Sequence, residues 1–205
     1  MPLFPHLPFD PTESHLSFAA RLAAFHTGGG VSTLLNNLDI KPEDFSRGQE
    51  ELIVALARHA DVDPAAIIAN TPISTGKARY DLRGEAISAD FLSSPFTVCC
   101  PACLLEMDRS HPNPILARRG RFEWPLCVVR TCPIHEIALI ERPFGASEDR
   151  FHELSLRFPE RGEALRSLVE ASGRRYRRGR GRGRRRPGGC TARPSPRFDR
   201  PAPWF

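Results

Sequence analysis

Four residues in the middle of the chain have the types and the spacing of a metal site. Two residues separate Cys100 from Cys103 and Cys132 from His135, and a proline follows the first ligand of each pair. This spacing lets both side chains of a pair reach one ion, and three thiolates with one imidazole form a closed tetrahedral set for Zn²⁺. We therefore predict one structural zinc ion. The 28 residues between the pairs exceed a usual finger spacer, so folding must join the two pairs.

The same cysteines have other readings. Cys100 and Cys103 could serve a thiol-disulfide enzyme, but only Pro-Ala separates them and no βαβ pattern surrounds them. Free cysteines are often simply buried, and disulfides need an oxidising compartment, to which nothing in the chain points. Two matched pairs favour metal. The substitute ligands are Cys99, which should point away from its neighbour Cys100, and Cys127, which lacks a paired ligand.

Helical patterns dominate the part of the chain that precedes these ligands. Asp10-Pro11-Thr12-Glu13 resembles a helix start, with an apolar stripe that continues to Phe25. Further helices are predicted at residues 31–38, 46–59 and 65–69. The last two have the outline of a helix-turn-helix. A plain packing hairpin is the alternative, because Ala-Ala-Ile-Ile-Ala offers almost no side chains that read bases.

The segments around the ligands are expected to be short elements and loops. Residues 71–88 read as a polar loop with basic side chains that could contact phosphate. One helical turn is predicted at 104–107, and short strands at 128–129 and 137–140. Arg118, Arg119 and Arg121 precede Phe122 and Trp124, which suggests a nucleic-acid contact, while Trp124 itself is expected in a small core.

The C-terminal third separates into helices and a basic tract. Helical spacing covers 148–172, with a break near Pro159. The 205-residue chain has a net charge of +5, but residues 174–205 hold twelve arginines and one acid, which leaves −6 for residues 1–173. This tract is expected to be a disordered nucleic-acid arm; a C-terminus read out of frame is the alternative. The arm residues singled out are Arg174, Arg175, Arg177 and Arg178.

Several motifs resemble those of one family. CPACL, then Arg and Trp before an apolar run, then CPIHEIALI, together with the opening ESHLSFAARLAAFH, are similar to TniQ/TnsD-type proteins over about residues 7–141. The resemblance implies a target-site selection protein of bacterial transposons, which contacts DNA and recruits an AAA+ ATPase and a transposase. Many members carry a further Cys-x-x-Cys after the second pair. This chain has Glu141 to Phe144 there, so a second metal site is not expected.

The predicted fold is mainly α with a small zinc-ribbon-like module. It comprises an N-terminal helical, helix-turn-helix-like part (1–90), a zinc-binding module with short strands around two knuckles (91–145), C-terminal helices (146–173) and the tail (174–205). The longest apolar run, 52–57, is too short to cross a bilayer.

We expect a non-enzymatic adaptor in the bacterial cytoplasm, associated with the nucleoid, since no phosphate-binding loop, nucleophile elbow or set of catalytic carboxylates is present. The alternatives are a prophage or host transcription regulator and, in a different class, a thiol-disulfide enzyme.

Overall fold

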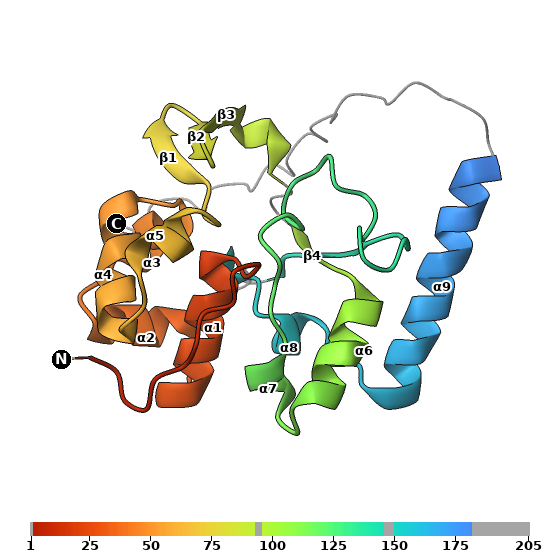
Figure 1. Cartoon of the computed structure of the whole chain (residues 1–205), viewed down its shortest axis with the longest axis horizontal. Helices are drawn as coiled ribbons and strands as arrows, with labels where there is room; N and C mark the ends of the chain where they lie inside the picture. The colour runs from red at the N-terminus through yellow and green to blue at the C-terminus, as the bar shows by residue number, and fades with distance from the viewer. Residues whose placement is uncertain (1, 93–95, 146–149, 182–205) are drawn as a thin grey trace, which may run out of the picture.

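The computed structural model describes residues 2–92, 96–145 and 150–181. It mixes helices with small sheets. The N-terminal part (2–92) holds five helices and a three-stranded sheet, and the C-terminal part (96–181) holds the ligand pairs; they occupy opposite ends of the molecule in Figure 1. The helices of the N-terminal part are α1 (His15–His26), α2 (Val31–Asn37), α3 (Pro42–Ser46), α4 (Glu50–Ala60) and α5 (Pro64–Ile68).

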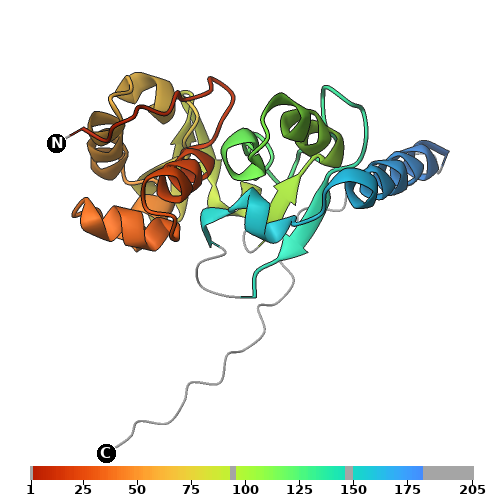
Figure 2. The ribbon, with the colours of Figure 1, turned by 90° about the horizontal axis from the view of Figure 1, so that it is seen from below.

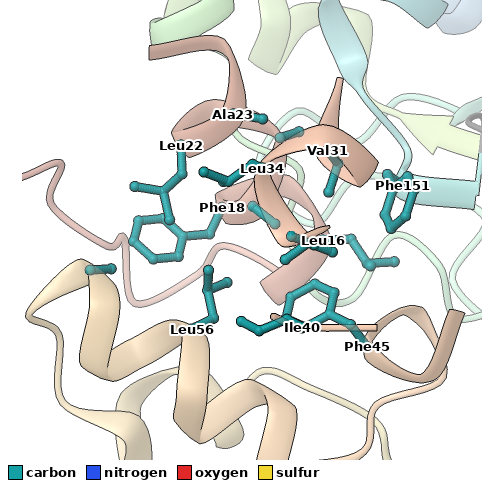
Figure 3. Close-up of a cluster of buried hydrophobic side chains, with 14 of the residues drawn as sticks. Leu16, Phe18, Leu22, Ala23, Val31, Leu34, Ile40, Phe45, Leu56 and Phe151 are labelled. Atoms are coloured by element: carbon teal, nitrogen blue, oxygen red, sulfur yellow. The ribbon is translucent and has the colours of Figure 1, made fainter. Parts of the chain in front are cut away.

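One apolar core joins the five N-terminal helices. Figure 3 shows Phe18 and Leu22 of α1 directed toward the same interior as Leu56 of α4. Phe45 of α3 is fully buried there, and Phe151 reaches the same core from the C-terminal part. Burying such side chains contributes about 1.5–3 kcal/mol each. This core fixes the helices as one layer.

Two predicted helix starts are wrong by several residues. The first helix begins at His15, where Ser14 caps the N–H of Ser17, while Asp10 accepts hydrogen bonds from Thr12 in a preceding turn. The helix predicted at 46–59 begins at Glu50 instead, because Gly48 adopts φ +73° and separates it from α3.

The segment 71–88 forms a sheet and not the predicted loop. Its antiparallel strands are β1 (Ile73–Gly76), β2 (Arg79–Leu82) and β3 (Glu85–Ser88). Two-residue turns with positive φ connect them, at Lys77-Ala78 and at Arg83-Gly84. The 3₁₀ helix η1 (Ala89–Phe91) follows the sheet.

The C-terminal part is built around a second core. Its elements are β4 (Phe96–Cys99), α6 (Pro101–Ser110), α7 (Pro114–Ala117), β5 (Ile140–Pro143), α8 (Leu154–Arg157) and α9 (Gly162–Gly181). Trp124 is 1% exposed in this core, as predicted, and Phe158 and Leu165 are fully buried beside it. The single helical turn predicted at 104–107 is a ten-residue helix. The strands predicted at 128–129 and 137–140 are replaced by an isolated bridge between Thr131 and Ala138 and by β5.

A buried polar network connects the two parts. Glu13 and Arg21 form an ion pair with 0% and 3% of their side chains exposed. Ser17 donates to Glu13 and accepts from the backbone N–H of Gly120, whose carbonyl accepts from the N–H of Ser14. Breaking a buried ion pair of this kind costs about 3–5 kcal/mol. The first helix is therefore locked to the C-terminal part.

The basic tract begins as a helix. α9 continues to Gly181, so the expectation of disorder from residue 174 is wrong for residues 174–181; the remainder of the predicted arm lies outside the described residues. α9 lies at the edge of the molecule, on the far side of α6 from α1–α5 (Figures 1 and 2).

Candidate metal centre

Strand pairing solves the problem of the long spacer. β4 ends at Cys99, directly before the first ligand pair (Cys100, Cys103), and β5 begins at Ile140, shortly after the second ligand pair (Cys132, His135). The two strands are antiparallel, with Cys99 opposite Ile140. This pairing fixes the ends of the segment between them, so both ligand pairs lie at the same end of a two-stranded sheet.

The two ligand pairs have different backbone settings. Cys100 caps α6 and Cys103 lies in its first turn, with Pro101 at the first helical position. In the second pair, the N–H of Glu136 donates to the carbonyl of Cys132, and Glu136 has φ +50°. The second pair is thus a tight knuckle, as the spacing predicted, whereas the first is the start of a helix. The helix N-terminus favours thiolate over thiol.

The four ligand atoms lie within 4.8 Å of one another. The Sγ atoms of Cys103 and Cys132 are 3.7 Å apart. Nδ1 of His135 lies 3.6, 3.3 and 3.6 Å from the sulfur atoms of Cys100, Cys103 and Cys132. A tetrahedron with metal–sulfur bonds of about 2.3 Å and metal–nitrogen bonds of about 2.0 Å has edges of about 3.5–3.8 Å. The cluster could therefore hold a metal ion, and its dimensions fit zinc.

The thiols influence one another's ionisation. Hydrogen bonds to Cys100 and Cys132 raise the pKa of Cys103, whereas hydrogen bonds from Cys100 and Cys103 lower the pKa of Cys132. One thiolate with two thiol donors is the arrangement that the protein alone supports. Ionising all three would place like charges side by side, and a bound cation would offset that repulsion.

Glu106 orients the histidine ligand. Its carboxylate lies 3.0 Å from Nε2 of His135, on the opposite side of the ring from the sulfur atoms. Burial lowers the pKa of His135, but the hydrogen bond to Glu106 more than compensates, so the pKa is raised. A carboxylate that accepts from Nε2–H leaves Nδ1 free to bind the metal. Sequence analysis missed Glu106, although its position one helical turn after Cys103 on α6 was readable.

The two substitute cysteines stay out of the cluster. Cys99 is fully buried, and burial raises its pKa. The Cys127 thiol donates to the carbonyl of Asp90, 3.1 Å away. The grouping of Cys100, Cys103, Cys132 and His135 therefore matches the predicted ligand set.

The predicted nucleic-acid arginines differ in their surroundings. Arg118 is 2% exposed, forms two hydrogen bonds to Asp108 and donates to the carbonyls of Phe158 and Glu160. The prediction for Arg118 is corrected on that ground, because a guanidinium occupied on every side within the fold does not reach phosphate. Arg119 pairs with Asp10 at 2.7 Å, and Arg121 pairs with Glu123.

The arginines of the basic tract lie along α9. Arg174 and Arg175 are exposed, and Arg177 and Arg178 follow on the same helix. Within the described part of the chain, no helix is both long and apolar enough to cross a membrane.

Comparison with known proteins identifies the family. The TniQ family model matches residues 4–139, about two thirds of the chain, which includes the N-terminal helices and all four ligands. A search of curated proteins and a search of solved structures each gave no match. The buried Glu13, Ser17 and Arg21 lie in the ESHLSFAARLAAFH stretch, so the opening motif has a structural role that sequence analysis did not assign. The chain belongs to the TniQ family of transposition-associated proteins.

Proposed function

We propose that this chain is a non-catalytic adaptor in DNA transposition, which helps select target DNA and recruits the transposon's AAA+ ATPase and transposase. The observation that carries the proposal is the TniQ match over residues 4–139, a span that includes the helical layer and the metal cluster together. This role places the chain with DNA in the bacterial cytoplasm. A thiol-disulfide activity has no comparable support.

In this proposal one zinc ion is held by Cys100, Cys103, Cys132 and His135. The ion is structural: four protein ligands leave no position open for a reacting water. It would hold the start of α6 against the knuckle, and the network of Glu13, Arg21 and Gly120 would transmit that rigidity to α1. An adaptor needs such a fixed surface, because a pre-organised surface loses less entropy on binding.

The DNA contacts proposed are local. Residues 1–173 carry −6, so bulk charge in the body opposes DNA, and positive charge concentrates in the basic tract. We assign phosphate contact to Arg174, Arg175, Arg177 and Arg178 on α9, and in the body to Arg119 and Arg121, which would exchange their acidic partners for phosphate.

Co-purification with the AAA+ ATPase encoded beside this gene tests the proposal. The full chain should retain the ATPase, and chelation of the metal should release it. Exchanging Arg119 and Arg121 for Ala should weaken DNA binding and leave the ATPase contact intact. If the chain instead binds a promoter as a dimer and retains no ATPase, the adaptor function is wrong and the regulator alternative replaces it.

A further inference from the structure

A cavity of about 240 Å³ lies where the helical layer, the three-stranded sheet and the C-terminal part meet. Its floor is the first turn of α1, and the end of α3 forms one side. Tyr80, Leu92, Phe122 and Phe144 supply apolar and aromatic wall. Aromatic walls that surround a space of this size suit a planar, ring-shaped group.

His15, in the first turn of α1, is the polar group without a partner in this wall. It is 4% exposed, and neither ring nitrogen has a hydrogen-bond partner among the described residues. Burial, and to a lesser extent His152, lowers its pKa to about 3, so the imidazole is neutral and offers one donor and one acceptor. Leaving such a group unsatisfied is costly, and few occur in native proteins. A ligand with a hydroxyl or N–H at the end of a ring would satisfy it.

The surroundings of the cavity favour an anion beside that ring. Arg47 and Arg150 line it, and their acidic neighbours Asp44 and Glu43 are 3.6 and 3.4 Å away. The N-terminus of the twelve-residue α1 faces the same space with no acidic residue in its first turn. Glu13, directly before this turn, is already paired with Arg21. A carboxylate at this point would meet positive potential.

We propose that this cavity receives a tyrosine side chain from a protein partner, with an acidic residue next to the tyrosine in the partner's sequence. The ring fills the aromatic walls, the phenol hydroxyl bonds to His15, and the neighbouring carboxylate meets Arg47 and Arg150. An unstacked nucleobase with its phosphate has similar chemistry, but the −6 charge of residues 1–173 favours the protein ligand. The inference rests on the proposed adaptor function only for the existence of a docking protein.

Titration of the full chain with blocked dipeptides, followed by NMR, tests the site without any variant. N-acetyl-Tyr-Glu-amide should shift the signals of His15, Tyr80 and Phe122 in a saturable manner. N-acetyl-Phe-Glu-amide and N-acetyl-Tyr-Lys-amide should bind about fivefold more weakly, because each loses one polar contact. No saturable shift below about 20 mM, or equal binding of all three dipeptides, overturns the proposal. So does stronger binding by adenosine monophosphate, which would make the site a nucleotide site.

Two variants separate the cavity from the rest of the fold. Leu92→Trp should fill the space and abolish dipeptide binding, and His15→Leu should remove the preference for Tyr over Phe. His111→Leu, at an exposed loop position, is the matched control and should bind as the native chain does. Dipeptide binding without ATPase retention overturns the adaptor function alone, and ATPase retention without dipeptide binding overturns this site alone.

Discussion

The carboxylate of Glu106 decides how well one ligand is presented. It fixes the ring of His135 from the side opposite the sulfur atoms, so that Nδ1 faces them. We predict that Glu106→Ala weakens metal binding about 10- to 100-fold, because the ring loses its orientation. Competition with a chromogenic chelator measures this change.

Glu141→Ala is the matched control, since this exposed acid pairs with Arg130 and not with a ligand. Equal metal affinity in the two variants would contradict the role given to Glu106.

His15 gives the fold a dependence on pH. Its folded pKa, about 3, lies below the value of about 6.5 expected in the unfolded chain, so the unfolded state binds the proton first as pH falls. The stabilisation is complete above pH 6.5 and is lost progressively below it. Between pH 6.5 and 4.5 the native chain should lose about 2–3 kcal/mol more unfolding free energy than His15→Phe does. Parallel stability curves for the two chains would show that His15 is not buried as a neutral group.

The ligand residues were readable because their chemistry is carried by residue type and spacing alone. Cys100, Cys103, Cys132 and His135 need only be found in two matched pairs. Glu106 and His15 were not found, because a carboxylate on a helix and a histidine in an apolar stripe are common on surfaces and in cores. Arg118 was misjudged for the same reason: its partners Asp108 and Phe158 become neighbours only after folding.

At the level of elements, glycines with positive φ set the turns that divide the N-terminal part. Gly48 has φ +73°, and a Cβ there would lie 2.0 Å from the carbonyl oxygen of Pro72. Gly76 has φ +95° with no atom within 4 Å of such a Cβ. Gly48→Ala should therefore cost several kcal/mol, whereas Gly76→Ala should cost only about 1–3 kcal/mol from backbone strain. Urea unfolding of both variants compares them, and equal losses would contradict the close contact at Gly48.

Amphipathic helices were predictable and the sheet was not. The Asp63-Pro64 signature gave α5 almost to the residue, because cap and helix lie together in sequence. Strands β1 to β3 are four residues each, largely polar and half-exposed, so they carry no alternation that a reader could detect. The first of their turns, Lys77-Ala78, lacks glycine and asparagine. Their pairing depends on neighbours in space, which periodicity does not record.

At the level of the whole molecule, the fold continues beyond the family match. The TniQ match ends at residue 139, yet Phe158 and Leu165 are fully buried in the core beside the ligands. Arg118 also ties α6 to the segment between α8 and α9. The metal centre is therefore supported by a C-terminal segment that the family motifs do not include.

Two truncations separate support from charge. Deleting residues 146–205 should unfold the C-terminal part, because Phe158 and Leu165 leave its core. Deleting only residues 174–205 should leave the melting temperature nearly unchanged. It should also remove most non-specific DNA binding and its salt dependence, because that tract carries twelve arginines. Circular dichroism and salt-dependent DNA binding measure both, and undiminished binding by the shorter truncation would place the DNA surface in the body.

Metal content tests the central claim most directly. Native mass spectrometry of the freshly reduced chain should show one zinc ion per molecule. Cys132→Ser should lose the ion and with it the folded C-terminal part, because binding energy in such sites is folding energy. Cys127→Ser should keep the ion, since that thiol bonds to Asp90. A native chain without zinc, or a Cys132→Ser chain that keeps it, would contradict the account.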